Sequence, residues 1–212
     1  MDSCCQEKAC ELEQLRAGQS KTLWIVLFVN AAMFVIELIA GHLAGSVALQ
    51  ADSLDMLGDA LVYGFSLYVI ARSIKWRAAS AILKGTVMAV FGLGVLGQTI
   101  YKLFYGGIPE AQLIGGFGTL ALLANLFCLF LLTRHRSDDV NMRSTWLCSR
   151  NDIISNVSVL VAAALVSASG TMWPDIVVGL LITGLFLRTA LSVIAEARAE
   201  LNNPVGEANP IS

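Results

Sequence analysis

The chain has 212 residues, of which 56% are hydrophobic and 14% are charged, and its mean hydropathy is +0.70. Soluble domains contain about 25% charged residues, so this composition predicts a membrane protein. The 14 basic and 16 acidic residues leave a net charge of -2, which excludes a strongly basic surface for nucleic acid. The length leaves little room for a large soluble domain beside a set of spanning helices.

Residues 1–21 are polar and do not resemble a cleaved signal peptide, so we expect a cytoplasmic tail that contains Cys4, Cys5 and Cys10. Six apolar runs follow, each close to the roughly 17 to 25 residues that a spanning helix needs. They cover residues 22–44, 46–71, 79–104, 112–133, 142–168 and 174–195. We therefore predict an all-α fold, a bundle of six transmembrane helices over residues 22–196, with a short cytoplasmic tail at 197–212.

Basic residues indicate the orientation of this bundle, because short loops rich in Lys and Arg stay in the cytoplasm during insertion. They gather before the first run, around the second connection, around the fourth connection and after the last run, at Lys8, Arg16, Lys21, Arg72, Lys75, Arg77, Lys84, Arg134, Arg136, Arg143 and Arg198. Both termini are therefore predicted to be cytoplasmic, in a multi-pass protein of the cell's inner membrane.

Three aspartates lie inside the second run, where charge is least tolerated. Each acid near the centre of a spanning helix costs about 2.5 to 3.5 kcal/mol on insertion. Asp52, Asp55 and Asp59 follow each other at spacings of three and four residues, so they form one stripe along a helix. Such a stripe indicates a functional site rather than packing.

The fifth run carries a second polar stripe, with Cys148, Asp152 and Asn156 four residues apart. If the second and fifth helices pack side by side, Asp55 and Asp59 can meet Cys148 and Asp152 near mid-membrane. Two carboxylates from one helix and a thiolate and a carboxylate from the other supply four ligands, the number that tetrahedral zinc takes. Because protons and metal compete for the same oxygens, such a site can couple metal movement to proton movement.

Further residues are candidates for supporting roles. Asp52, Asn156, Glu37 and His42 are candidates for an accessory metal site or a proton pathway; interhelical hydrogen bonds for Glu37 and a solvated loop for His42 are the alternatives. Cys4, Cys5 and Cys10 are candidates for capturing soft ions, with an unstructured tail as the alternative. Asp175 follows Pro174 and is predicted to cap the start of the sixth helix.

These residues resemble the cation diffusion facilitator family of proton-coupled divalent metal transporters. The resemblance rests on paired motifs that fall on Asp55 and Asp59 and on Cys148 and Asp152, and on Glu37, Gly41, Ser46, Leu49, Ala51, Asp52, Arg143 and residues 175–179. It implies export of zinc-like ions from the cytoplasm in exchange for protons by a homodimer, with the metal as substrate and no cofactor. Cys148 stands where the family usually has His and should favour zinc or cadmium. No cytoplasmic domain is expected after the sixth helix, so dimerisation would rest on membrane helices.

Two other classes of protein are alternatives. An intramembrane aspartyl protease would also bring together acids from different helices, but the Gly-x-Gly-Asp pattern is absent before Asp59. A membrane metal sensor or chaperone built around the tail cysteines would bind metal without moving it. The transporter, which is not an enzyme, is the reading that accounts for the acids on both helices.

Overall fold

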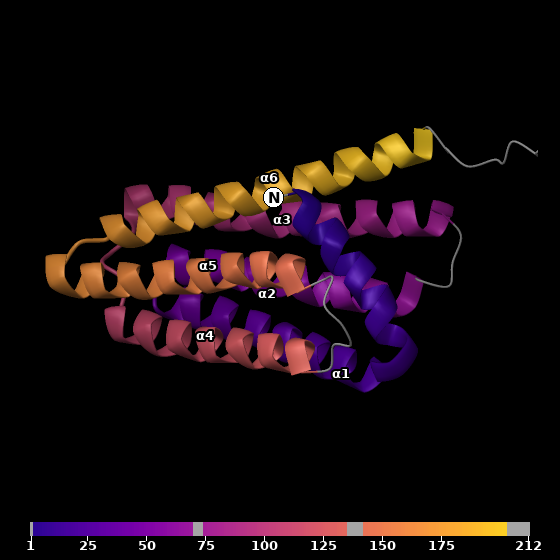
Figure 1. Ribbon diagram of the computed structural model, residues 1–212. Helices are drawn as coiled ribbons and strands as arrows, with labels where there is room; N and C mark the ends of the chain where they lie inside the picture. Colours follow the sequence, from indigo (N-terminus) through magenta and orange to yellow (C-terminus); the bar gives the residue numbers. More distant parts are fainter. Residues whose placement is uncertain (1, 70–73, 135–141, 203–212) are drawn as a thin grey trace, which may run out of the picture.

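The computed structural model describes residues 2–69, 74–134 and 142–202, with side chains at 21–65, 67, 79–133 and 152–199. Within these ranges the chain forms six α-helices and no strand. The helices lie lengthwise in one elongated bundle, except that the N-terminal part of α1 runs obliquely across it (Figure 1). They are α1 (Asp2–Leu43), α2 (Val47–Val69), α3 (Ile74–Tyr105), α4 (Ala111–Arg134), α5 (Met142–Ser169) and α6 (Trp173–Asn202).

The six predicted helices are all present, and the helical membrane bundle is confirmed. In the described residues five helices are long and apolar enough to cross a membrane, over Lys21–Leu43, Ala79–Tyr105, Ala111–Thr133, Asp152–Ser169 and Trp173–Ala199. The remaining helix, α2, has 23 residues but carries three aspartates. α1 begins at Asp2, so the polar segment before residue 22 continues the helix of the first span.

The helices associate in sequence-distant as well as neighbouring pairs. α1 packs most extensively on α2, α3 on α6, and α4 on α5, while α2 also contacts α6 and α5. Three connections meet at one end of the bundle, where the Glu110 N–H donates to the Ala44 carbonyl at 2.9 Å. We call this the outer end, following the predicted topology.

Glycine is needed for structural reasons at two kinds of position, after the end of a helix and at a close contact between helices. Gly45 and Gly170 follow α1 and α5 with φ of 60° and 62°, a left-handed conformation that commonly ends helices and that glycine adopts without strain. Gly85 and Gly92 instead let α3 approach α6, because a Cβ on either would lie 2.6 Å from a side-chain carbon of Ile194 or Leu187. Close packing of α3 on α6 therefore depends on glycine at these two positions.

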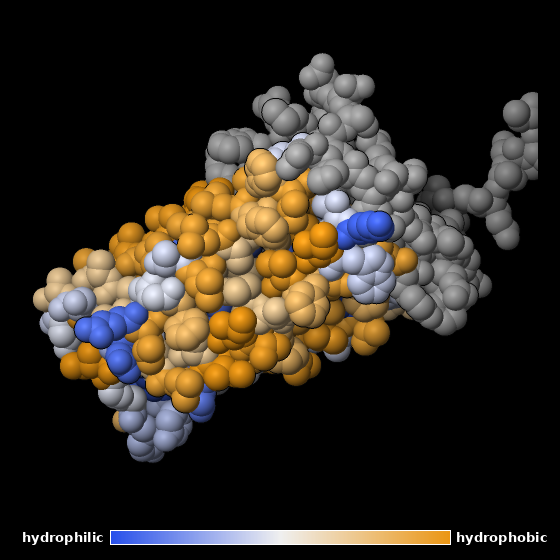
Figure 2. Space-filling model, turned by 90° about the horizontal axis from the view of Figure 1, so that it is seen from below, coloured by the Kyte–Doolittle hydropathy of each residue, from blue (hydrophilic) through white to orange (hydrophobic). Residues whose placement is uncertain are grey.

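Large apolar side chains cover the outside of the bundle. In the face shown in Figure 2 hydrophobic residues form a continuous surface, and hydrophilic residues lie toward the ends. The most exposed large side chains are Phe28, Leu43, Phe104 and Tyr105. Since lipid is the solvent that such a surface requires, the chain is a multi-pass membrane protein. Its buried core is built largely from small and branched residues of α1, α2, α5 and α6.

Candidate metal centre

The structure brings the two predicted acidic helices, α2 and α5, together. The Ser155 hydroxyl on α5 donates a hydrogen bond to Asp52 Oδ1 on α2 at 2.7 Å. Small core residues make this approach possible: Ala48 and Ala51 on α2 and Ala162 on α5 are fully buried in the same cluster. α2 and α5 therefore meet at Asp52 and Ser155.

Acids from both helices act on one another at this junction. Asp55 interacts electrostatically with Asp52, with Asp59 and with Asp152, and Asp152 also acts on Asp52. Asp52 is 1% exposed, whereas Asp55, Asp59 and Asp152 are half-buried. Neighbouring like charges repel in a medium of low dielectric constant, so these pairwise interactions favour binding of a cation or of protons.

Several buried oxygen atoms at this junction have no hydrogen-bond donor in the described part of the chain. They are Glu37 Oε1 and Oε2, Asp52 Oδ2 and Asn156 Oδ1. Glu37 and Asn156 are fully buried, and the Asn156 amide N–H donates to the Asp152 carbonyl at 2.7 Å. A native membrane bundle rarely leaves so many polar atoms unsatisfied, so this region has unused capacity to bind a cation.

The predicted accessory residues fall into two groups. Glu37 on α1 lies within hydrogen-bonding reach of Asp52 on α2, which places both carboxyl groups in one cluster. His42 is exposed in the last turn of α1. Of these candidates, Glu37, Asp52 and Asn156 are buried and His42 is not.

The complete ligand set stays a prediction. Among the side chains that the structure describes, no three His, Cys, Asp or Glu groups are close enough to form a metal site. The fourth predicted ligand, Cys148, lies on α5 one turn before Asp152, but its side chain is outside the described ones. The side chains of Cys4, Cys5 and Cys10 are outside them as well.

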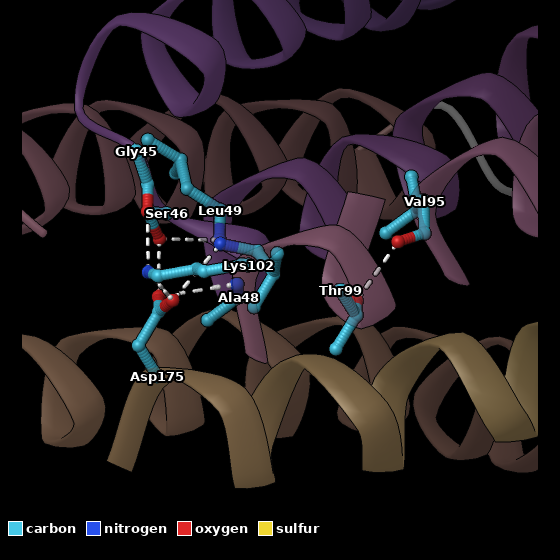
Figure 3. A network of polar contacts seen from close by, with 9 residues as sticks. Gly45, Ser46, Ala48, Leu49, Val95, Thr99, Lys102 and Asp175 are labelled. Atoms are coloured by element: carbon cyan, nitrogen blue, oxygen red, sulfur yellow. Dashed lines mark hydrogen bonds and ion pairs between the residues drawn. The ribbon is translucent and has the colours of Figure 1, made fainter. Parts of the chain in front are cut away.

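A second polar cluster, at the outer end, contains a buried ion pair between Lys102 and Asp175 (Figure 3). Asp175 Oδ2 accepts from Lys102 Nζ at 2.8 Å and from the Val47 N–H at 2.9 Å. Asp175 Oδ1 accepts from the Ser46 hydroxyl and from the Ala48 N–H. Lys102 Nζ also donates to the Gly45 carbonyl. One carboxylate thus caps α2 and joins it to α3 and α6.

The prediction that Asp175 caps its own helix is wrong. Its carboxylate receives the N–H groups of Val47 and Ala48 at the start of α2, while it lies in the first turn of α6. The acid does interact favourably with a helix N-terminus, as expected. That N-terminus belongs to α2 and not to α6. We assigned no role to Lys102 from the sequence. A lone cation and a lone acid at the outer ends of two helices nevertheless indicate an ion pair.

Comparison with known proteins gives the family. The model of the cation efflux transmembrane domain matches residues 23–202. The zinc transporter ZitB of Pectobacterium atrosepticum is 29% identical over 200 residues, which are 87% of this chain and 62% of the relative. The metal cation efflux system protein CzcD of Cupriavidus metallidurans is 24% identical over 198 residues, 84% of this chain and 63% of the relative.

A more distant relative is the cadmium, cobalt and zinc/H(+)-K(+) antiporter of Bacillus subtilis, 21% identical over 197 residues. The chain spans about 62% to 63% of the length of these curated relatives. The matched region includes all the buried acids described above. The chain therefore belongs to the cation efflux family, the cation diffusion facilitators that its paired motifs resemble.

Proposed function

We propose that this protein exports zinc or cadmium from the cytoplasm across the inner membrane in exchange for protons. The main observation in support is the meeting of α2 and α5 through Ser155 and Asp52, with Asp55, Asp59 and Asp152 acting on one another beside it. The names of the relatives, which include zinc transport, cation efflux and an H(+)-K(+) antiporter, support the same direction and coupling.

The proposed metal ligands are Asp55 and Asp59 of α2 with Cys148 and Asp152 of α5. Thiolate and carboxylate together suit zinc, and the thiolate favours cadmium over hard ions such as magnesium or manganese. Binding requires deprotonated ligands, so metal entry releases protons and proton entry releases metal. The same competition lets the proton gradient drive metal export, so antiport needs no other energy source.

Transport by the purified protein tests this proposal. The protein is reconstituted in liposomes, a pH gradient is imposed, and zinc and cadmium movement is followed with a trapped fluorescent indicator. We expect gradient-dependent metal movement by the wild type and none by Asp59→Ala. Glu110→Gln, which changes an exposed acid of the outer connection, is the matched control and should transport normally. Metal movement no faster than in empty vesicles would refute the proposal.

The proton coupling has a separate equilibrium signature. Since protons compete with metal for the carboxylates and the thiolate, apparent zinc affinity should fall as pH is lowered. Calorimetric titration between about pH 6 and pH 8 measures this dependence. An affinity that stays constant over that interval would leave metal transport possible but exclude competition as its coupling mechanism.

Cys148 is proposed as the residue that sets the preference for soft ions. A Cys148→His variant keeps four ligands, so zinc transport should continue while the preference for cadmium over zinc declines. Competition between the two metals in the vesicle assay reports this ratio, and an unchanged ratio would remove Cys148 from the ligand set. A sensor or chaperone built on Cys4, Cys5 and Cys10 would instead bind metal with no flux.

We also propose that the protein acts as a homodimer joined by its membrane helices. The exposed apolar faces provide enough surface for a partner as well as lipid. Light scattering of the protein in detergent measures the mass of the protein component, and a monomer at every concentration would contradict a stable dimer.

A further inference from the structure

The buried carboxyl groups of Glu37 and Asp52 form a pair that the proposed metal ligands do not include. Glu37 is fully buried on α1 and Asp52 is 1% exposed on α2. The two carboxyl groups lie within hydrogen-bonding reach of each other. Neither Glu37 oxygen, nor Asp52 Oδ2, accepts from any donor in the described residues.

Two carboxylates cannot hydrogen-bond to each other, because each has only acceptor atoms. The contact becomes a hydrogen bond when one proton is present, since the protonated group then donates to the ionised one. An unpaired ionised carboxylate is also very costly where no water reaches it. One shared proton therefore satisfies both groups and removes one of two neighbouring negative charges.

None of the interactions that the structure describes for the pair is with a cation. Asp55 acts on Glu37 and Asp152 acts on Asp52. The described side chains of α4, which packs on α1, include no charged one, whereas α3, which packs on α2, carries the buried Lys84. On α6 the buried acid Asp175 is paired with Lys102. The Ser155 hydroxyl already donates to Asp52 Oδ1, which holds Asp52 in place and leaves its other oxygen facing a group without a donor.

We propose that Glu37 and Asp52 form a dedicated proton-binding site, separate from the metal ligands, which carries one of the protons exchanged for metal. This inference rests on the proposed antiport. Asp52 lies seven residues, about two helical turns, outward of Asp59 along α2, so a proton entering from the outer end reaches the pair before the metal ligands. Metal bound near Asp55 places positive charge beside the pair and expels its proton, which leaves Glu37 and Asp52 ionised and facing the cation.

Counting protons released per zinc ion bound tests the proposal. Calorimetric zinc titrations of the full-length protein in two buffers of different ionisation enthalpy give this number directly. We expect Glu37→Gln to release fewer protons than the wild type, by up to one per zinc ion, while zinc affinity at high pH changes little. Thr183→Val, which alters a fully buried hydroxyl of α6 without a partner, is the control and should release as many as the wild type.

A shared proton makes a sharper prediction for combined variants. Asp52→Asn should lose the same proton as Glu37→Gln, and the double variant should lose no more than either single one, because both remove one site. Infrared difference spectra of zinc binding should lose the band of a protonated carboxyl group in all three. Equal proton counts and a persistent band in the variants would overturn the proposal.

Three other results of these experiments would each have a distinct meaning. A fall in zinc affinity of about tenfold or more in Glu37→Gln at high pH would make Glu37 a metal ligand and overturn the separate site. Suppression of wild-type proton release by potassium, but not by choline, would show that the pair holds an alkali cation instead. If the wild type itself binds zinc without flux, the proposed transport function fails, whereas the variants still decide whether the pair holds a proton.

Discussion

The two buried polar clusters of this bundle differ in how fully their atoms are paired. At the outer end both oxygens of Asp175 accept hydrogen bonds and Lys102 donates to two acceptors. At the junction of α1, α2 and α5, Glu37 and Asp52 present oxygens without a donor among the described residues. The first cluster is complete by itself, whereas we propose that the second is completed by the ions it binds.

This difference separates a structural role from a transport role. A satisfied buried ion pair fixes helices in place, and removing one partner leaves a costly unpaired charge. An unsatisfied group of acids is unstable until a cation binds, so it supplies binding free energy for a substrate. Substitutions should therefore affect stability at the outer end and function at the junction of α2 and α5.

The largest effect is expected from Asp175→Ala. It leaves Lys102 without its partner and removes the cap from α2, so the free energy of unfolding should fall by about 3 to 5 kcal/mol. Denaturant unfolding in mixed micelles measures this change. Thr99→Val, on the same helix as Lys102, removes only a hydroxyl bonded to its own helix at 2.8 Å and should cost about 1 kcal/mol or less.

A double substitution sharpens the same point. Replacing Lys102 with Met and Asp175 with Leu removes both charges, so part of the lost stability should return relative to Asp175→Ala. If the double variant were less stable than the single one, the unpaired charge would not be the cause of the loss.

Asp55→Asn should have the opposite effect to Asp175→Ala, because it should reduce transport without reducing stability. It removes one of several mutually repelling acids, so stability should stay constant or rise. Metal transport should fall about 100-fold, equivalent to about 2.7 kcal/mol. Parallel measurement of unfolding and of vesicle transport tests both parts, and a loss of transport that merely follows a loss of folded protein would remove the distinction between the clusters.

Gly179→Ala should weaken the outer junction by packing alone. An added Cβ would lie 2.9 Å from the Val47 carbonyl carbon and 3.0 Å from the Ala48 nitrogen, so α6 must move away from α2. We expect a loss of about 1 to 3 kcal/mol in unfolding free energy. Gly184→Ala on the same helix meets nothing within 4 Å and should be neutral or slightly stabilising; equal losses in both would argue for a backbone effect.

The smallest effect is expected from Ser155→Ala. It deletes the one hydrogen bond recorded between α5 and Asp52 among the described side chains, which should cost about 1 kcal/mol of stability. Ser158→Ala removes a hydroxyl that bonds within α5 and serves as the control. A shift in proton release by Ser155→Ala with no change in Ser158→Ala would confirm that Ser155 orients Asp52; identical behaviour of the two would contradict it.

Much of the fold could be predicted because hydropathy determines where helices cross a membrane. The runs at 79–104 and 112–133 lie within α3 and α4, whose bounds extend slightly beyond them. The helical continuation of α1 to Asp2 was not predicted, because a polar segment carries no apolar signal even where it is helical.

The sites were predictable to different degrees for a physical reason. Acids within an apolar run are visible in the sequence, and this is how Glu37, Asp52 and Asp55 were singled out. Their partners are not visible, because Ser155 is an ordinary residue until α5 meets α2. Asp175 was assigned to its own helix for the same reason: sequence shows an acid in a first turn but not which helix N-terminus it faces.

The cap that Asp175 places on α2 also constrains the order in which the chain assembles. Val47 and Asp175 are 128 residues apart, so at about 5 to 20 residues per second the ribosome needs roughly 6 to 25 s to supply the acid after α2 is made. Until then the N–H groups of Val47 and Ala48 lack the acceptor that they have in the folded bundle. α6 thus completes α2, and the outer end of the bundle closes only after the first turn of α6 has been made.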